Sequence, residues 1–316
     1  MATSFIPDLR QLRSFVALAE SGSFTTAAKN LRLTQSAISH SVRSLEEALT
    51  TKLVDRHGKR SVLTREGELI YQTASRVLSD LESSLSEIES LRKWGQGRIR
   101  VGMTHALCHH LLPTVLREFR DCFAHCEVTV EAGDTASLLG KLDNSEIDLA
   151  IGLELPDAHG VEFSPLFMDE LVIAVAPHHD WAGGQIKTEE GNSRHQLILY
   201  SRQSETFRLV NQFFDKLGAR LKSPMVLGDM EAIKSLAMAG IGGGVIASWF
   251  AKAEFESGKL VALPFKNPSI RRTWGCYLRT KRKLSLVEET FVGVCEMAGK
   301  NLEVFRPAAM PLRKKG

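Results

Sequence analysis

The residues best suited to specific chemistry lie on one face of a predicted helix near residue 40. The side chains that share this face at helical spacing are all hydrogen-bonding groups, and none is an acid: Ser36, Ser39, His40 and Arg43. A polar, acid-free helix face of this kind is what contact with base edges in the major groove of DNA requires. The alternative is an ordinary solvated helix face, because helical hairpins of similar sequence are common.

Two predicted helices joined by a tight turn, within Ser23 to Val42, position this face. Ser23 and Thr34 are placed to cap the two helices, since a hydroxyl can accept a hydrogen bond from an unpaired N–H of the first turn. Apolar residues spaced by three and four mark the side of each helix that faces inward. They are Phe24, Ala27, Ala28 and Leu31 in the first helix, and Ile38, Val42, Leu45 and Leu49 in the second.

A helix before this hairpin and a β-hairpin after it complete the predicted N-terminal head. Leu12 to Ala19 form an amphipathic helix, and Gly22 is placed to end it. The segment from Lys52 to Thr64 predicts a small β-wing, which suits a phosphate or minor-groove contact. Its tip carries Arg56, His57, Lys59 and Arg60. The alternative is a solvated turn.

The charge distribution favours a nucleic-acid partner for the head. With 316 residues, 43% hydrophobic and 24% charged, the chain has the composition of an ordinary soluble protein of two or three domains. Its net charge is only +3, but residues 1–65 hold ten Lys or Arg against five Asp or Glu. Residues 66–94 hold three bases against six acids. The positive charge is therefore concentrated where phosphate binding requires it.

We expect a cytoplasmic protein without a membrane segment. The chain opens with no basic-then-apolar signal segment, and it contains no apolar run of 18 or more residues. Five cysteines is an odd number for a disulfide framework, and a reducing compartment disfavours one.

One long helix is predicted from Thr64 to about Lys93. Its apolar stripe is heptad-like and consists of Ile70, Ala74, Val77, Leu81, Ile88 and Leu91. Because a long helix with one apolar stripe needs a partner helix, we interpret it as a dimer seam. The alternative is a helix that packs on its own domain. The glycines of Trp94–Gly97 end the helix.

From Arg98 onward, strands and helices alternate, which is typical of a parallel α/β sheet. Predicted strands lie at 99–103, 128–130, 149–151, 171–176, 197–200, 225–227, 244–247 and 274–278. Predicted helices lie at 104–119, 135–142, 205–217, 230–239 and 285–302. We interpret these elements as two α/β lobes of similar size. The chain would cross between them near Ala174 and Gly275, so that the second lobe is inserted in the first.

Together these segments resemble the LysR-type transcriptional regulators over nearly the whole chain. The resemblance is carried first by SFTTAAKNLRLTQSAISHSVRSLE, KLVDRHGKR and LTREGE. It continues through RIRVGM, IDLAIG, DELVIAVAPHHDW and EAIKSLAMAGIGGGVIASW. Three positions depart from the family pattern. Thr50 stands where glycine is common, Val54 where phenylalanine is common and Glu66 where alanine is common.

The resemblance implies an α/β fold with an N-terminal all-α winged helix-turn-helix domain, a long linker helix and a two-lobed effector domain resembling type 2 periplasmic binding proteins. The implied limits are 1–65 for the DNA-binding domain, 66–94 for the dimerisation helix, 98–174 with 276–316 for lobe I, and 175–275 for lobe II. The implied partners are double-stranded operator DNA, a small-molecule effector and further copies of the chain in a dimer or tetramer. RNA polymerase is a further candidate partner, and no cofactor is expected.

The family match also assigns DNA-facing residues. Gln35 can bond N6 and N7 of adenine, and Arg43 can bond guanine or a phosphate. The full predicted DNA-binding set is Ser23, Thr34, Gln35, Ser36, Ser39, His40, Arg43, Arg56, Lys59 and Arg60.

Six residues are expected near the cleft between the lobes by the same match: Thr104, His105, Thr135, Ser201, Arg202 and Met230. Ligands of α/β lobes bind beyond the carboxyl ends of the strands. The first strand ends at Met103-Thr104-His105, just before a helix N-terminus, which attracts anions. We therefore expect an anionic or polar effector. The alternative is that most of the six are loop or packing residues.

Two other patterns receive ordinary interpretations. Zinc ligation needs three or four converging side chains, which spacing alone does not show. We therefore assign the Cys and His cluster to helix surface or core, with metal or redox sensing as the alternative. The cluster comprises Cys108, His109, His110, Cys122, His125 and Cys126. The run Gly240–Gly244 follows a helix and lacks the last glycine of a dinucleotide fingerprint, so it predicts a helix-to-strand turn.

The leading hypothesis is therefore a ligand-responsive DNA-binding regulator. A solute-binding component of a transporter is the first alternative, against which the capped hairpin and the missing signal segment argue. An enzyme is the second, and no catalytic constellation supports it.

Overall fold

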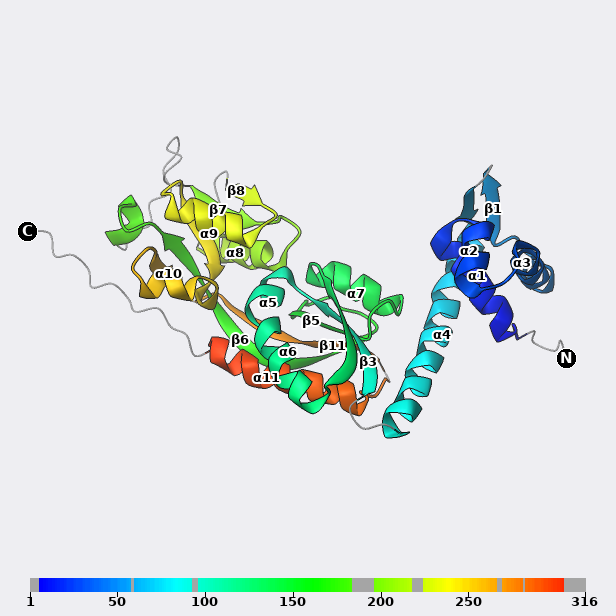
Figure 1. Ribbon diagram of the computed structural model, residues 1–316. Coiled ribbons are helices and arrows are strands. Elements are labelled where there is room, and N and C mark those ends of the chain that lie inside the picture. Colours follow the sequence, from blue (N-terminus) through cyan, green and yellow to red (C-terminus); the bar gives the residue numbers. More distant parts are fainter. Residues whose placement is uncertain are drawn as a thin grey trace, which may run out of the picture. The chain divides into compact units, whose positions relative to one another are not determined.

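The computed structural model describes residues 6–57, 60–92, 96–183, 196–217, 224–265, 269–280 and 282–303. They form two compact units, one built from the chain up to Gly97 and the other beginning at Arg98 (Figure 1). Within the described residues, no helix is both long enough and apolar enough to cross a membrane.

The N-terminal unit consists of three short helices, a two-stranded wing and a long helix. Its elements are α1 (Leu9–Ser21), α2 (Phe24–Leu31), α3 (Gln35–Leu49), β1 (Val54–His57), β2 (Arg60–Leu63) and α4 (Arg65–Arg92). Strands β1 and β2 pair antiparallel.

Side chains at the helix ends explain where the short helices begin and end. The Asp8 carboxylate accepts a hydrogen bond from the Arg10 N–H at 2.8 Å and so caps α1, and Gly22 ends that helix in the left-handed region at φ 60. The Ser23 hydroxyl accepts from the Thr26 N–H at 3.5 Å. The Thr34 hydroxyl accepts from the Ala37 N–H at 3.2 Å, which caps α3.

The core of this unit comes from the apolar stripes of α1, α2 and α3 together with the start of the wing. Phe15, Leu18, Ala27, Ile38 and Leu45 are fully buried in it. These side chains bury one stripe of each helix, and burial of that apolar surface stabilises the arrangement at roughly 25 cal/mol per Å². The opposite face of α3 is therefore left toward solvent.

Helix α4 packs on its own unit at one end only. Ile70 and Tyr71 pack against the core of the N-terminal unit, whereas Val77, Leu81 and Leu85 are 44%, 41% and 54% exposed. The apolar stripe that the sequence predicts as one seam is therefore divided between an intramolecular contact and an exposed part. The side chains of Ile88 and Leu91 lie outside the described residues.

The second unit is built on a mixed sheet with the strand order β4-β3-β5-β11-β6-β9-β7-β8, and β10 also pairs with β6. The strands are β3 (Gln96–Met103), β4 (His125–Ala132), β5 (Leu149–Leu153), β6 (Val161–Val175), β7 (Leu197–Tyr200), β8 (Met225–Leu227), β9 (Gly243–Ala247), β10 (Val261–Pro264) and β11 (Arg271–Arg279). The helices are α5 (His105–His110), α6 (Leu112–Cys122), α7 (Thr135–Asp143), α8 (Glu205–Lys216), α9 (Met230–Met238), α10 (Lys252–Glu256) and α11 (Leu286–Glu303).

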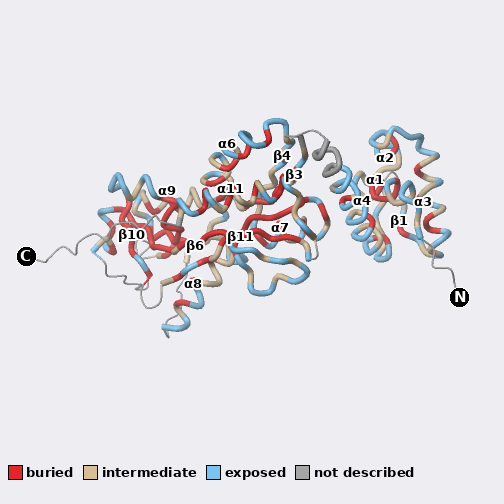
Figure 2. The backbone as a smooth tube through the Cα atoms, turned by 90° about the horizontal axis from the view of Figure 1, so that it is seen from below, coloured by how far each residue is buried: buried red, intermediate tan, exposed pale blue. Residues whose placement is uncertain are grey.

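Helices cover both faces of this sheet, as its fully buried strands require. Ile151 of β5 faces the core that also contains residues of α5, α6 and α11. Its neighbour Ala150 faces the opposite side and packs with Leu138 and Leu142 of α7. Figure 2 shows the buried strands in red beneath mostly exposed helices.

Strand β6 carries the chain from one half of the sheet to the other. Its first part pairs antiparallel with β11, and its last residues pair antiparallel with β9 and β10. In contrast, β3 pairs with β5 and β7 pairs with β8 and β9 in parallel. The prediction of a purely parallel sheet was therefore incomplete, because two long antiparallel strands join the parallel halves.

Several other elements differ from the prediction. Leu111 and Pro113 divide the single helix expected after β3 into α5 and α6, because proline favours the first turn of a new helix. Strand β6 starts at Val161 rather than near residue 171, and β10 was not predicted. Gln96 and Gly97, expected in a linker, belong to β3. The predicted limits 98–174 with 276–316 and 175–275 for the two lobes stay a proposal.

Thr50 gives a direct test of local strain. It follows α3 in the left-handed region, at φ 52, where a β-branched residue is strained. We expect Thr50→Gly to stabilise the N-terminal unit by roughly 0.5–1 kcal/mol, measured as a higher midpoint of its thermal transition. Thr25→Gly, on the exposed face of α2, is the control and should destabilise slightly, by about 0.3 kcal/mol. Equal destabilisation by both changes would contradict the strain argument.

Candidate DNA-reading surface and ligand cleft

Helix α3 presents the predicted polar face to solvent. Gln35, Ser36, His40 and Arg43 are exposed and Ser39 is half-buried, whereas Ile38, Val42 and Leu45 on the other side are buried. The hydroxyls of Thr34 and Ser36 lie 3.0 Å apart at the start of the helix. A capped helix with a polar exposed face has the form needed to enter a major groove.

Arg43 is held within its own helix by an acid that the sequence analysis did not single out. Its Nε lies 2.8 Å from Glu47 Oε1, and both side chains are more than half exposed. An exposed pair at this spacing is weak, on the order of 0.3–0.5 kcal/mol, so the guanidinium can exchange it for a phosphate or a base.

A buried carboxylate fixes the wing to the end of α3. Glu46 accepts hydrogen bonds from the N–H groups of Leu53 at 2.9 Å and Val54 at 3.3 Å, and from Lys52 Nζ at 2.9 Å. Burial acts to raise the pKa of Glu46, but these hydrogen bonds outweigh it and lower the pKa. The charged carboxylate therefore orients the wing relative to the DNA-reading face.

The structure describes only some of the wing residues that the sequence predicts to contact DNA. Arg56 and Arg60 lie on β1 and β2, where Arg56 pairs in register with Ser61. Lys59 lies outside the described residues.

The second unit contains a cavity of about 570 Å³ between its two halves. Of the six residues predicted near the cleft, five line this cavity: Thr104, His105, Thr135, Arg202 and Met230. Ser201 does not line it. Its carbonyl instead accepts hydrogen bonds from Ser204, which caps α8.

Two of the lining threonines have different roles. The Thr135 hydroxyl accepts from the Leu153 N–H at 3.1 Å and is buried, which makes it a structural link between α7 and β5. The Thr104 hydroxyl precedes α5, is buried, and has no hydrogen-bond partner in the described part of the chain. An unpaired buried hydroxyl beside the cavity is a candidate ligand contact.

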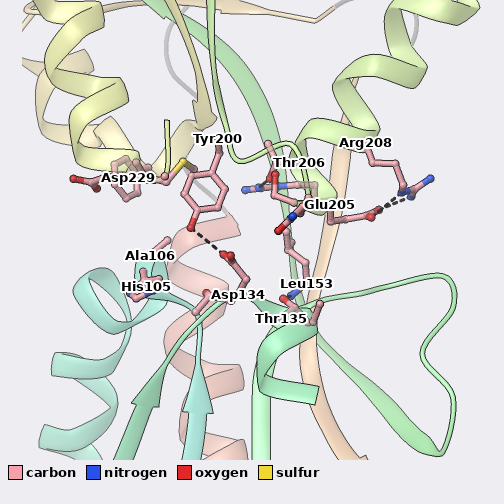
Figure 3. A pocket seen from close by; sticks show the side chains of 18 of the residues that line it. His105, Ala106, Asp134, Thr135, Leu153, Tyr200, Glu205, Thr206, Arg208 and Asp229 are labelled. Carbon is pink, nitrogen blue, oxygen red and sulfur yellow. Dashed lines mark hydrogen bonds and ion pairs between the residues drawn. The ribbon is translucent and has the colours of Figure 1, made fainter. Parts of the chain in front are cut away.

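A hydrogen bond spans the cavity between its two walls. Tyr200, at the end of β7, donates from its hydroxyl to Asp134 Oδ1 at 2.9 Å (Figure 3). Burial raises the pKa of Tyr200, and the hydrogen bond and charge of Asp134 and the charge of Asp229 raise it further. The phenol therefore remains a donor. Neither residue was predicted, although Tyr200 ends a predicted strand and Asp134 follows another.

Arg272 lines the floor of the cavity and forms a buried ion pair with Asp169 beneath it. Arg272 Nε donates to Asp169 Oδ1 at 2.9 Å, and Trp249 Nε1 donates to Asp169 Oδ2 at 2.9 Å. Arg272 Nη1 also donates to the Thr206 hydroxyl at 2.7 Å. This network ties β6, β11, α8 and the segment before α10 together below the ligand space. Sequence reasoning missed it, because its members are far apart in the chain.

The Cys and His cluster does not converge. Within the described residues, no group of three or more His, Cys, Asp or Glu side chains is placed to hold a metal ion. Burial raises the pKa of Cys108, and it raises the pKa of Cys126 to about 11, which reduces the reactive thiolate of both. His110 packs instead against the rings of Trp249 and Phe250.

The fold and the two sites define a class: a winged helix-turn-helix unit on a long helix, joined to a two-lobed unit with a ligand cleft. Residues 9–68 match the family profile described as bacterial regulatory helix-turn-helix protein, lysR family. Residues 94–299 match the LysR substrate binding domain. The chain belongs to the LysR family of bacterial transcriptional regulators, with a DNA-binding domain and an effector-binding domain.

Individual relatives agree with this assignment. The chain is 30% identical to the uncharacterized HTH-type transcriptional regulator YeiE of Escherichia coli (strain K12), over 92% of this chain and 97% of that protein. It is 27% identical to the RuBisCO operon transcriptional regulator of Allochromatium vinosum, over 88% of this chain and 91% of that protein.

Solved structures share the fold of the whole chain. Full-length OxyR of Pseudomonas aeruginosa has 22% identity and a TM-score of 0.71, over 96% of this chain and 98% of that one. CbnR, solved with its target DNA, has 21% identity and a TM-score of 0.62, over 92% and 99%.

Arg43 provides the test of the DNA-reading face. We expect Arg43→Ala to weaken operator binding at least tenfold, about 1.4 kcal/mol, in a titration at fixed salt. Arg117→Ala is the matched control, since Arg117 is also exposed and paired with an acid, Glu118, but lies in the effector-binding unit. Unchanged affinity of the Arg43 variant would reject its assignment to the DNA contact.

Asp169 provides the test of the cavity floor. Asp169→Asn removes the charge that compensates buried Arg272, and we expect a loss of about 3–5 kcal/mol in the stability of the effector-binding unit. Thermal or denaturant unfolding measures it. Glu118→Gln breaks an exposed pair and should cost less than about 1 kcal/mol. Similar small losses in both variants would show that the floor pair is not structurally important.

Proposed function

We propose that this regulator binds double-stranded operator DNA through α3 and the wing, and binds a small polar effector in the cavity between lobes I and II. One observation carries this proposal: the chain contains two separate features that are exposed and suited to recognition. One is the exposed polar face of α3, and the other is a cavity lined from both lobes by polar side chains.

The DNA contact that we propose uses the full predicted set. Gln35, Ser36, Ser39, His40 and Arg43 would face the groove, while the caps Ser23 and Thr34 bring backbone N–H groups near phosphates. Arg56, Lys59 and Arg60 would extend the contact along the wing. Operator DNA lies in the cytoplasm, so we place the protein there.

Self-association follows from the exposed part of α4. Val77, Leu81 and Leu85 recur every four residues on an exposed helix face, and such a stripe needs a covering partner. A second copy of α4 would cover it and would present two α3 helices to two half-sites of one operator. We propose a dimer of this kind, which can pair further into a tetramer, with RNA polymerase as a downstream partner.

The effector would act by changing the arrangement of the two lobes. Because the cavity walls come from both lobes, a ligand that contacts both favours one lobe arrangement over others. The change in lobe arrangement would be transmitted through the self-associated chains to the N-terminal units that read DNA. No catalytic step is part of this proposal.

A solute-binding role is the competing function, and DNA binding separates the two. We expect the full chain to shift a DNA fragment from its own upstream region in a gel assay, with affinity that falls as salt rises. A fragment of scrambled sequence is the control. Equal binding to both fragments, or none to either, would contradict sequence-specific regulation.

A further inference from the structure

The charged side chains that line the cavity are not all neutralised by the protein. Glu205 pairs with Arg208, Glu231 pairs with Lys234, and Arg272 pairs with Asp169. Once these pairs are set aside, and apart from the imidazoles of His105 and His109, the lining retains two acids and one guanidinium that lack an oppositely charged partner among the described residues. They are Asp134, Asp229 and Arg202.

The two acids come from opposite walls. Asp134 lies before α7 and, among the described residues, its side chain accepts only from the neutral phenol of Tyr200, at 2.9 Å. Asp229 caps α9 by accepting the Glu231 N–H at 3.0 Å, and it comes from the same wall as Tyr200 (Figure 3). Burial is the main cause of the raised pKa of Tyr200, and the negative charges of both carboxylates raise it further.

Hydrogen-bond donors without acceptors mark the other part of the lining. Arg202 sits over the Phe207 ring, 5.5 Å from its centroid, and no carboxylate in the described part of the chain pairs with it. Trp274 lines the cavity, is 3% exposed, and its indole N–H has no acceptor among the described residues. The buried Thr104 hydroxyl is also without a partner there. A buried donor without an acceptor is unfavourable, and a ligand oxygen that accepted from it would remove that cost.

We propose that the effector is a small zwitterion of the amino-carboxylate class, with its cationic group at Asp134 and Asp229 and its carboxylate at Arg202. This inference rests on the proposed function, because it names the class of ligand for the same cavity. A purely anionic ligand would satisfy Arg202 but would leave two carboxylates near its negative charge. A purely cationic ligand would leave Arg202, Trp274 and Thr104 without acceptors. The volume of about 570 Å³ suits a small molecule.

The test uses three matched series of probes with the full chain. The first contains the proteinogenic amino acids, the second the corresponding amines without the carboxylate, and the third the corresponding carboxylic acids without the amine. We expect a concentration-dependent rise in melting temperature from at least one amino acid, and none from its amine or its acid. Stabilisation by acids alone, by amines alone or by no probe would overturn the zwitterion assignment.

Two charge-removing variants then locate the groups. Asp134→Asn keeps an acceptor for Tyr200 but removes the charge, and we expect it to weaken binding of the stabilising amino acid at least tenfold by calorimetry. Arg202→Gln should weaken the same amino acid at least tenfold. Asp121→Asn, an exposed acid on α6 outside the cavity, is the matched control and should leave the dissociation constant unchanged.

These experiments distinguish failure of the zwitterion assignment from failure of the proposed function. Unchanged affinity in both cavity variants would reject these contacts even if an amino acid binds. If the Asp134 variant melts much lower without ligand, Arg202→Gln decides the question. Loss of sequence-specific binding in the gel assay would overturn the proposed function, whereas a normal gel shift with acids as the only ligands would overturn only this inference.

Discussion

The ion pair between Asp169 and Arg272 is the interaction on which the effector-binding unit depends. It joins the two strands, β6 and β11, that run side by side at the junction of the lobes. Asp169 also accepts from Trp249, and Arg272 also donates to Thr206 in the first turn of α8. Desolvating two charges is costly, so the pair is stable only because hydrogen bonds satisfy both partners.

This buried pair gives the cavity a fixed floor while its walls remain separate elements. Above the floor, one hydrogen bond between described residues, from Tyr200 to Asp134, joins the walls. A bond between a neutral phenol and an exposed carboxylate contributes little net free energy, on the order of 1 kcal/mol. A ligand that binds between the walls therefore competes with a weak contact, and not with the ion pair that holds the sheet together.

The DNA-reading unit also contains one buried charged side chain and neighbouring exposed ones, and the two kinds have different roles. Glu46 is buried and bonded to the backbone of the wing, whereas Glu47, its neighbour, is exposed and pairs loosely with Arg43. Two adjacent acids on one helix thus have opposite roles, because the helical turn directs one toward the core and the other toward solvent. The exposed acid leaves Arg43 free to change partners on DNA, and the buried one keeps the wing in place.

The sequence by itself determined the N-terminal unit almost completely. Its helices are amphipathic and locally capped, so residues such as Gly22, Ser23 and Thr34 indicate the boundaries from neighbours within three positions. The α/β character of the rest was also readable, because alternating strands and helices follow from short-range periodicity. The family membership followed from motifs that span nearly the whole chain.

Only the tertiary structure decided how the distant parts meet. The mixed sheet depends on β11 pairing with β5 and β6, strands more than a hundred residues earlier, and no local pattern reports such pairing. The same holds for the Asp169 and Arg272 pair and for Tyr200 opposite Asp134, whose roles arise from contact across the fold. The division of the α4 stripe into a packed and an exposed part likewise depends on what lies beside the helix. Local sequence sets helix ends and faces, whereas the partner of each buried charge is set by the folding of the chain as a whole.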